Sequence, residues 1–446
     1  MRRVLVIVSS LLFCATASGA EWRAGIAATD VTPSSLIWMA GYASRNHPAE
    51  GVLHPLWAKA LAIEDAAGRR AVIVTADLIG FQRELCDRVA ERVKPATGLE
   101  RAGVLLNTSH THSGPVVRSV AKVAYHLDAK NEEGVRAYAK TLEDKLVALI
   151  EQACAALQPA KLAFGEGKAT FAMNRRSKRP QGYVIGPNPD GPVEHTVPVL
   201  RVSDEQGHLR AVLFGYACHN TTTAVYQFNG DYAGFAQIAL QKAHPEAAAL
   251  FMIGCGGDSN PEPRGKIEMA EAHGKALAEA VDRVLAGAMK PLAGPLSTAL
   301  ERVDLPFVDP PSKQALEELA EGKDVYRQRL ARNLLAQLKE KGSIAASYPA
   351  PVQVIRFGED LVMIGLPGET VVDYALRLRK ELPGRRLWIA GYCNEVFTYL
   401  PSERVLAEGG YEAGGAMVYF GIHGPFKPGV EDRIVGLAKR LATEPQ

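Results

Sequence analysis

Two histidines separated by one residue, His110 and His112, are the side chains of this sequence best suited to bind a metal or transfer a proton. They follow the apolar run 103–106, which predicts a short buried strand. Side chains alternate between the two faces of a strand, so we expect both imidazoles to point the same way. Two imidazoles on one face suit a metal ion or a proton-transfer site. The alternative, a chance His-x-His in a polar loop, is equally compatible with this segment taken alone.

Other polar side chains also follow predicted strands. The strands concerned are residues 71–76, 211–217, 248–253, 361–366 and 387–390. His219 follows the second of these, Asp258 lies in the glycine-rich loop after the third, and Glu369 follows the fourth. Ligands of α/β proteins bind outside the carboxyl ends of strands, so we expect these loops to converge. Convergence of His219 and Glu369 with the histidine pair would give a zinc site with an open position for water.

Each of these residues has a purely structural alternative. His219 could be a buried core histidine, Glu369 an acid beside the dipole of a following helix, and Asp258 a helix cap or turn residue. Several familiar chemistries are excluded, because the mature chain has no Gly-Lys-Ser/Thr phosphate loop, no His-Glu-x-x-His helix and no Gly-x-Ser-x-Gly elbow.

Composition bounds the kind of protein. The 446 residues are 47% hydrophobic and 22% charged, which is typical of one large globular domain or two closely packed ones. The 51 Lys and Arg residues nearly balance the 49 Asp and Glu residues, and the absence of long basic runs argues against nucleic acid as a partner. The six cysteines form no Cys-x-x-Cys pair, so we expect mostly buried free thiols with at most one or two disulfides.

The N-terminus is typical of a cleaved secretory signal, residues 1–20. Arg2 and Arg3 provide the positive start, residues 4–14 the apolar stretch, and residues 18–20 the small-residue cleavage site. That stretch is too short to span a membrane, and no other segment is apolar enough, so no transmembrane segment is expected. We expect residues 21–446 to form one catalytic domain that is secreted or periplasmic.

Strands and helices are mixed along the chain. Further strands are predicted at residues 58–64, 199–202 and 352–357, and helices at residues 83–93, 135–157, 267–285, 313–341, 371–382 and 431–441. This pattern predicts an α/β fold with mixed β-sheets layered with helices and a site at the C-terminal ends of strands. The charged segment 313–341 is interpreted either as a surface insertion or lid, or as a plain solvated helix.

Several motifs, taken together, resemble the catalytic domain of the neutral/alkaline non-lysosomal ceramidases. In chain order they are Ala24-Gly25-Ile26-Ala27-Ala28-Thr29-Asp30-Val31-Thr32-Pro33, residues 107–115, Asn174-Arg175, Ala217-Cys218-His219, Asp231-Tyr232-Ala233-Gly234, Pro367-Gly368-Glu369, and Tyr399 followed by Tyr411-Glu412. Each motif alone is weak, and their joint order carries the resemblance.

The resemblance implies a site and an activity. The implied zinc ligands are His110, His219, Glu369 and Tyr399. His112 is implied to shuttle protons, and Arg175 and Tyr411 to stabilise charge on the scissile carbonyl, although Arg176 is adjacent and either arginine could face the site. The implied activity is hydrolysis of an amide bond in a small-molecule or lipid-like N-acyl substrate.

The sequence departs from the family in two ways. Asn260 takes the place of the family's serine in Gly257-Asp258-Ser259-Asn260-Pro261-Glu262, and we count Asn260 and Asp258 among the catalytic residues. An amide cannot attack a carbonyl, so water activated by zinc is the more economical nucleophile, with Asn260 as a hydrogen-bond donor.

The family usually adds a C-terminal β domain, whereas this sequence ends at Gln446, so ceramide is one candidate substrate among several. The alternatives are a hydrolase of a small polar ester, amide or sugar derivative, and a noncatalytic binding protein with a metal pocket.

Overall fold

The computed structural model describes residues 21–117, 120, 123–125 and 127–444. The predicted secretory signal, residues 1–20, lies outside the described residues. Among the helices that are described, none is both long and apolar enough to cross a membrane.

A large, mixed sheet forms the centre of the molecule. Its strand order is β12-β10-β9-β6-β1-β3-β4-β5, with β14 paired to β6. The strands are β1 Trp22–Asp30, β3 Trp57–Asp65, β4 Arg70–Ala76, β5 Val104–Thr108, β6 Gln158–Lys168, β9 Thr196–Ser203, β10 Leu209–Tyr216, β12 Ala248–Ile253 and β14 Lys290–Pro291. The pairs β4–β5 and β10–β12 are parallel, and the other pairs are antiparallel.

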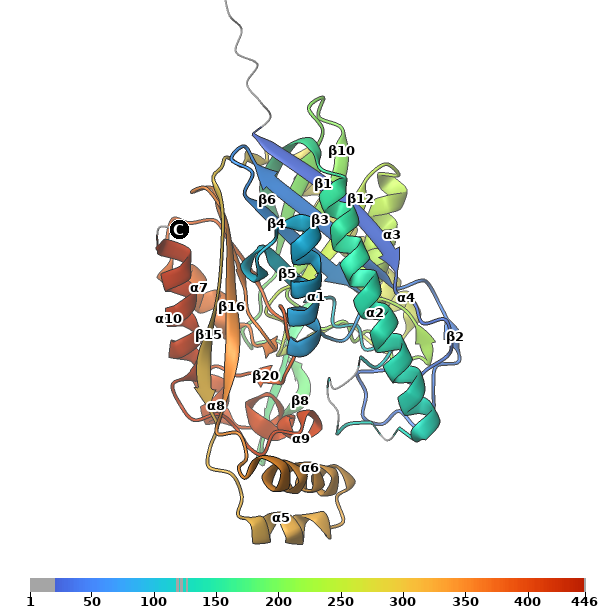
Figure 1. Cartoon of the computed structure of the whole chain (residues 1–446), viewed down its shortest axis with the longest axis vertical. Coiled ribbons are helices and arrows are strands. Elements are labelled where there is room, and N and C mark those ends of the chain that lie inside the picture. The colour runs from blue at the N-terminus through green and yellow to red at the C-terminus, as the bar shows by residue number, and fades with distance from the viewer. Residues whose placement is uncertain (1–20, 118–119, 121–122, 126, 445–446) are drawn as a thin grey trace, which may run out of the picture.

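A second sheet packs face to face with the first, and helices cover both outer faces (Figure 1). The order of the second sheet is β15-β16-β17-β19. Its strands are β15 Leu296–Pro306, β16 Ser347–Phe357, β17 Leu361–Gly365 and β19 Leu387–Ala390. The helices over the large sheet are α1 Arg83–Thr97, α2 Ala129–Ala155, α3 Asp231–Ala243 and α4 Ile267–Ala286, and those over the second sheet are α7 Asp373–Glu381 and α10 Val430–Thr443.

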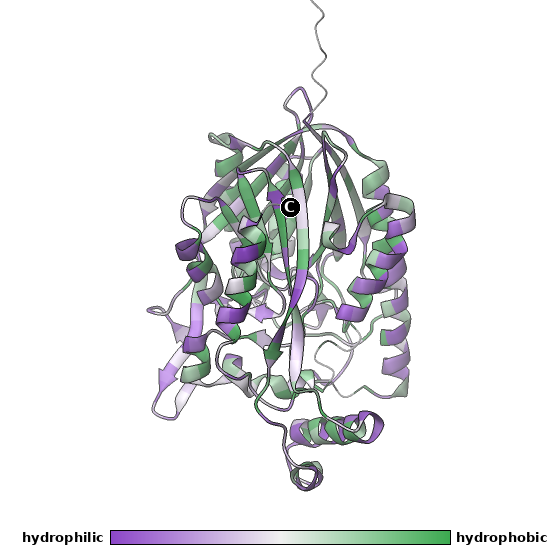
Figure 2. Ribbon diagram, turned by 60° about the vertical axis from the view of Figure 1, so that its left-hand side comes forward, coloured by the Kyte–Doolittle hydropathy of each residue, from purple (hydrophilic) through white to green (hydrophobic). Residues whose placement is uncertain are grey.

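Side-chain alternation produces these layers. In β4, Val72 and Val74 face the helices, while Ile73 between them faces the second sheet. In β17, Met363 faces the large sheet, while Ile364 packs towards α7 and α10. Each fully buried aliphatic side chain contributes roughly 1.5–3 kcal/mol, so the layer order is fixed by the period-two pattern. Figure 2 shows the result, with apolar strands inside and helices that are polar on their outer faces.

Further, mostly short elements connect these strands. They are the sheet β13-β7-β8 (Ser259–Pro261, Ala172–Arg179, Gly182–Asn188), the pairs β2–β11 (Gly51–Val52, Gln227–Phe228) and β18–β20 (Glu369–Thr370, Tyr399–Leu400), the turns Arg101–Gly103 and Tyr411–Gly415, and the helices α8 Glu403–Glu408 and α9 Met417–Phe420. None of these was predicted as an element. Two- and three-residue ladders such as β18–β20 carry no periodic signal, and the longer β7 and β8 lack the apolar run of about four or more residues that marks a buried strand.

The predicted fold class and all nine predicted strands are confirmed. The single helix predicted over residues 313–341 is wrong, because the chain forms a hairpin of α5 Lys313–Ala320 and α6 Val325–Lys341. The break lies where the Asp324 side chain accepts hydrogen bonds from Tyr326 N and Arg327 N and so begins a new helix. The hairpin has a small core of its own around Leu316 and Leu334.

The five cysteines among the described residues are free. Cys86, Cys218, Cys255 and Cys393 are buried, and Cys154 is half-buried. The prediction of mostly buried free thiols is therefore confirmed for this part of the chain.

One glycine fixes how closely β1 and α2 approach. A Cβ on Gly25 would lie 2.0 Å from the Ala153 carbonyl oxygen at the end of α2. We expect Gly25→Ala to lower the free energy of unfolding by about 3 kcal/mol, because backbone rather than a flexible side chain must move. Gly436→Ala is the matched control, since its Cβ meets nothing within 4 Å on an exposed face of α10, and it should be neutral or stabilise by up to about 1 kcal/mol. Urea denaturation of both variants measures the difference, and equal stabilities would contradict it.

Candidate metal centre and its cavity

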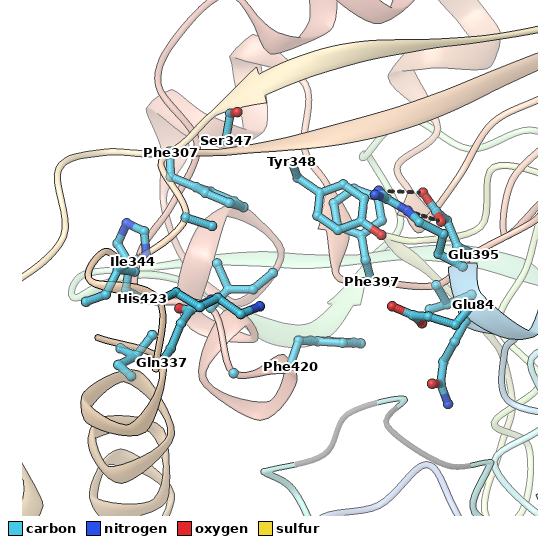
Figure 3. A pocket seen from close by; sticks show the side chains of 18 of the residues that line it. Glu84, Phe307, Gln337, Ile344, Ser347, Tyr348, Glu395, Phe397, Phe420 and His423 are labelled. Atoms are coloured by element: carbon cyan, nitrogen blue, oxygen red, sulfur yellow. Dashed lines mark hydrogen bonds and ion pairs between the residues drawn. The ribbon is translucent and has the colours of Figure 1, made fainter. Parts of the chain in front are cut away.

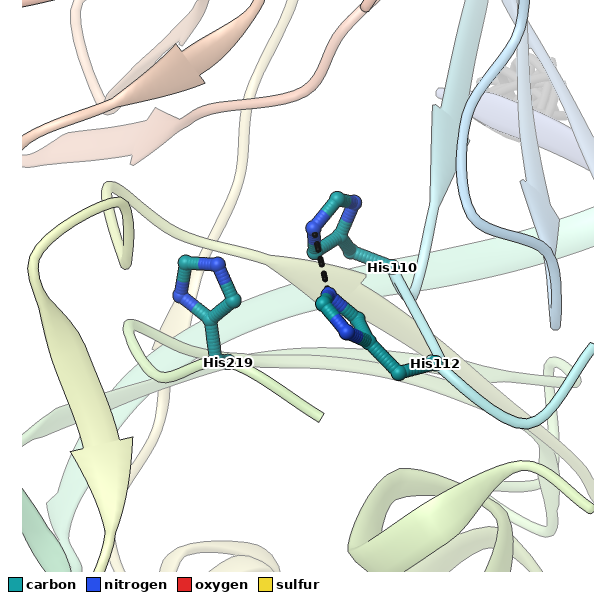
Figure 4. A group of neighbouring side chains, drawn as sticks. All are labelled: His110, His112 and His219. Carbon is teal, nitrogen blue, oxygen red and sulfur yellow. Dashed lines mark hydrogen bonds between the residues drawn. The ribbon is translucent and has the colours of Figure 1, made fainter. Parts of the chain in front are cut away.

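The polar residues expected from sequence do converge. His110 follows the C-terminal end of β5, His219 follows β10, and Glu369 begins β18 just after β17. Figure 4 shows His110 and His112 on one segment, facing His219 on another. His110 and His219 are only 2% and 0% exposed, so the cluster lies inside the protein at the carboxyl edge of both sheets.

The nitrogen and oxygen atoms of this cluster meet at short range. Glu369 Oε2 lies 3.2 Å from His110 Nε2 and 3.0 Å from His219 Nε2. His112 Nε2 lies 3.1 Å from His110 Nε2, and Tyr399 Oη lies 3.4 Å from His219 Nε2. Ligands of a tetrahedral zinc ion at bond lengths near 2.05 Å would be about 3.3 Å apart, so these separations fit a four-coordinate metal.

Hydrogen bonds on the far side of each ring fix which nitrogen carries the proton. His110 Nδ1 lies 2.6 Å from Ile79 O, and His219 Nδ1 lies 2.6 Å from Gly256 O. A carbonyl only accepts, so each Nδ1 donates and each Nε2 of the neutral ring presents a lone pair. Burial, followed by the charge of Arg175, lowers the pKa of His219 to about 4, which keeps that ring neutral near pH 7.

Lone pairs therefore face one another across the cluster. Two imidazole Nε2 atoms and a buried carboxylate oxygen all point at one volume. A cation in this volume would be bound by two imidazoles and one carboxylate. The donor set thus fits a bound metal ion.

Two ligand sets are compatible with the positions of these atoms. His110, His112 and His219 form a group whose ligand atoms lie within 4.8 Å of one another. Glu369 and Tyr399 contact His219 as well, which gives the four-residue set implied by the family resemblance. His112 differs from the other two histidines because its Nδ1 has no hydrogen-bond partner among the described residues, while its Nε2 contacts His110 Nε2. No carbonyl holds its ring from behind as a carbonyl holds the other two, and a ring without such a support suits proton transfer better than ligation.

The expectation that strand alternation orients His110 and His112 is wrong. β5 ends at Thr108, so His110 and His112 do not alternate along a strand. Instead His110 has a φ of 60°, a left-handed conformation that is uncommon outside glycine. The Asn220 side-chain amide donates to Ser109 O, and the Asn220 backbone carbonyl accepts from His112 N, so the bend is held against the loop after β10.

A two-residue ladder places Tyr399 beside Glu369. In the parallel pair β18–β20, Glu369 is the direct partner of Tyr399. Tyr399 Oη also accepts a hydrogen bond of 2.8 Å from Arg175. Burial raises the pKa of Tyr399 well above its usual value while the Arg175 charge opposes the rise, so only a nearby cation would make this phenol an anionic ligand.

Arg175, rather than its neighbour Arg176, faces the cluster. Arg175 contacts Tyr399 through one terminal nitrogen and Asn260 Oδ1, at 3.3 Å, through the other. Glu412 holds both arginines, with one oxygen 2.8 Å from Arg175 Nε and the other 2.7 Å from an Arg176 terminal nitrogen. Glu412 is 3% exposed, so this carboxylate is a buried brace behind Arg175. Only its place in the family motif could have drawn attention to it.

Asp258 and Asn260 occupy different positions relative to the cluster. Asp258 is fully buried, with its carboxylate held by Val372 N at 2.9 Å and Asn174 Nδ2 at 3.1 Å. Burial raises its pKa to about 7. It supports the backbone behind the site, and its predicted catalytic role stays a prediction. Asn260 contacts Arg175 and so lies at the edge of the reacting region.

A cavity of about 230 Å³ opens beside the histidines. Its wall includes His110, His112, Glu369, Tyr399 and Tyr411, so three of the four implied zinc ligands and two of the predicted catalytic residues line one cavity. Arg175 lies under this wall, with its guanidinium 5.9 Å from the Tyr411 ring centre.

The sequence analysis did not identify two residues that contact the histidines, Gly41 and Tyr392. A Cβ on Gly41 would lie 2.4 Å from the His112 side chain, so only glycine leaves room for that imidazole. The Tyr392 ring lies 4.5 Å from the His110 ring, and the buried Tyr392 hydroxyl has no partner among the described residues. Glycine and tyrosine in loops are too common to be singled out without the structure.

Comparison with known proteins shows that the chain is similar to neutral ceramidases. Residues 22–285 match the family described as neutral/alkaline non-lysosomal ceramidase, N-terminal. The chain is 26% identical to a neutral ceramidase of Pseudomonas aeruginosa over 98% of its own length and 75% of that protein. It is 27% identical to neutral ceramidase A of Dictyostelium discoideum over 55% of this chain and 36% of that one. The solved structure of the Pseudomonas aeruginosa neutral ceramidase superposes with a TM-score of 0.72 at 22% identity, covering 95% of this chain and 76% of that one, which confirms the fold.

The metal centre can be tested without reference to activity. We expect the purified chain to carry about one divalent metal ion, and His110→Ala and His219→Ala to lose it, because each removes one of the facing lone pairs. His273→Ala is the matched control, since His273 is also buried but bonds to Pro263 O and stacks on Phe171. Elemental analysis by mass spectrometry measures the content. Equal metal in all four proteins would show that the cluster is not the binding site.

Proposed function

Since this chain belongs to the neutral/alkaline non-lysosomal ceramidase family, we propose that it is a zinc-dependent hydrolase of the amide bond of an N-acyl compound. The proposed substrate is a small or lipid-like amide. We propose further that residues 1–20 direct the chain to a secreted or periplasmic location, where N-terminal sequencing of the mature protein should begin near residue 21.

One observation carries the assignment of zinc. The facing lone pairs of His110 Nε2, His219 Nε2 and Glu369 Oε2 form a nitrogen and oxygen donor set without sulfur. Imidazole and carboxylate in four-coordinate geometry are typical ligands of catalytic zinc. When bound there, zinc would lower the pKa of a water molecule and polarise a carbonyl.

We propose that His112 moves the proton. Its ring lines the cavity, and its Nδ1 makes no hydrogen bond within the described residues. Burial lowers the pKa of His112 well below its usual value, so the ring is neutral and able to accept a proton from the attacking water. The same ring can return that proton to the leaving amine.

We propose that Arg175 and Tyr411 stabilise the carbonyl oxygen. Arg175 carries a permanent charge and is braced by Glu412, so it is oriented before substrate arrives. The Tyr411 ring packs 5.4 Å from the Tyr399 ring, which places its phenol in the cavity wall. Asn260 uses its Oδ1 to accept from Arg175 and Thr221, which leaves its N–H donors for substrate.

Loss of the proton-transfer residue should separate activity from metal binding. We expect His112→Gln to lower kcat for hydrolysis of an N-acyl amide by roughly 10²–10⁴-fold, with bound zinc unchanged, because general acid–base catalysis contributes about that much. Chelation of the wild-type metal should abolish activity, and added zinc should restore it. His273→Gln is the buried control and should keep wild-type kcat. Full activity in His112→Gln would contradict the proposed role, and activity that survives chelation would contradict zinc dependence.

Substitution of Glu412 tests whether this carboxylate orients Arg175, and substitution of Glu408 is the control. We expect Glu412→Gln to lower kcat by about 10–100-fold with little change in zinc content, because Arg175 loses the carboxylate that orients it. Glu408→Gln removes a carboxylate that bonds to Arg176 and Arg404 but not to Arg175, so its kcat should stay near wild type. Steady-state kinetics beside elemental analysis distinguishes the two. Equal effects of both substitutions would show that Glu412 acts through general stability rather than through Arg175.

A further inference from the structure

A second, larger cavity adjoins the catalytic one. Its volume is about 660 Å³, and it lies between the start of α1, the end of α6, the start of β16 and the segment after α9. Val396 and Phe420 line both cavities, so the two share a wall. We refer to the larger cavity as the Phe420 groove.

The sizes of the two cavities imply that they work together. Small-molecule sites commonly have volumes of roughly 300–1,000 Å³. The catalytic cavity, at about 230 Å³, lies below that range, whereas the Phe420 groove, at about 660 Å³, lies within it. A substrate with its scissile bond beside His112 therefore needs room elsewhere, and the groove is the adjacent space.

One wall of the groove is aromatic. The rings of Tyr348 and Phe397 stack in parallel with centres 3.8 Å apart, and the Arg83 guanidinium lies 4.7 Å from the centre of the Tyr348 ring. Figure 3 shows Tyr348, Phe397 and Phe307 on one side of the space, with Phe420 across from them. Phe397 and Arg83 both cover the Tyr348 ring, whereas the Phe420 ring has no ring partner among the described residues. The face of Phe420 is therefore available to the C–H face of a ring-shaped ligand.

The remainder of the groove carries hydrogen-bonding groups without partners. Gln82, Ser347, Gln337 and Lys341 all line it, and their side chains make no hydrogen bond within the described residues. Arg83 and Glu395, by contrast, are paired with each other, and Glu395 also binds Arg302 at 2.9 Å. Two amides, a hydroxyl and an ammonium group are thus available to a ligand beside the aromatic wall.

An aromatic wall beside unpaired polar groups favours a sugar ring over an alkyl chain as the ligand of the groove. An alkyl chain in the groove would cover amide and ammonium groups without replacing their hydrogen bonds to water, which costs free energy for each group. A polyhydroxylated ring offers C–H faces to the aromatic wall and hydroxyls to the amides. We propose that the Phe420 groove binds a glycosyl head group on the amine side of the substrate. The proposal rests on the proposed amidase function, because it assigns the substrate class of the same site.

A binding experiment tests the groove independently of hydrolysis. The probes are octyl β-glucoside and 2-(octyloxy)ethanol, which share an alkyl chain and differ in the sugar, titrated into the full zinc-loaded chain by calorimetry below micellar concentrations. We expect the wild-type protein to bind the glucoside about tenfold more tightly, since a few new hydrogen bonds are worth about that factor. Equal affinities, or no binding of the glucoside, would overturn the proposal.

Substitutions in and beside the groove test whether the preference for the glucoside arises there. Ala345→Trp fills it from an exposed position, and Gln337→Leu removes one amide at similar size. Ala345→Trp should reduce the glucoside preference to near unity, and Gln337→Leu should reduce it in part, because the other polar groups of the groove remain. Ala346→Trp adds the same bulk at the next exposed residue, which does not line the groove, and should keep the preference. A preference that survives in Ala345→Trp would place the sugar elsewhere and overturn the proposal.

Hydrolysis distinguishes this proposal from the function on which it rests. The substrates are hexanoyl ceramide with and without a glucosyl unit, and we expect a KM about tenfold lower for the glucosylated amide in the wild-type protein only. Hydrolysis of both with the same KM would support the amidase and overturn the glycosyl site. Failure to hydrolyse either, with glucoside binding lost in Ala345→Trp, would support the groove and overturn the amidase.

Discussion

The whole site depends on one electrostatic constraint: lone pairs that face one another in a buried volume. Ile79 O and Gly256 O fix the tautomers of His110 and His219, so both rings present Nε2 to the Glu369 carboxylate. Burial of a carboxylate costs several kcal/mol unless hydrogen bonds or a cation compensate it, and a metal ion between these atoms would do so. The fold supplies the means to hold this arrangement, because both carbonyls and all three side chains come from loops at the carboxyl edges of the two packed sheets.

Uncommon backbone conformations gather around this constraint. His110, Asp231, Tyr392 and Asn394 have φ between 53° and 64°, although none of them is glycine. Such conformations persist where surrounding contacts over-determine them. The loop that contains Tyr392 and Asn394 is held by Leu106 and Asn107 of β5 and by Leu366 after β17, so it joins the two sheets at the point where the site is built. Rigidity at this joint keeps Glu369 and His110 in register.

Much of this organisation was predictable from sequence, for identifiable reasons. Strands such as 71–76 and 248–253 carry a strong apolar signal because both of their faces are buried, and the polar residues after them mark the carboxyl edge. His219 and Glu369 could therefore be placed before the structure was seen. Three features could not be. The left-handed turn at His110 replaces the expected strand, the pairing of Glu369 with Tyr399 is a two-residue ladder, and the choice of Arg175 over Arg176 depends on Glu412, far along the chain. Each of these is set by tertiary contacts rather than by local pattern.

The most direct measurement is a crystal structure of the zinc-loaded chain with anomalous diffraction recorded on both sides of the zinc absorption edge. A single strong anomalous peak is predicted between His110 Nε2, His219 Nε2 and Glu369 Oε2, with Tyr399 as the fourth protein ligand and His112 outside the coordination sphere. The absence of a peak, or a peak ligated by His112 in place of Glu369, would contradict the assignment of His112 as the residue that moves protons.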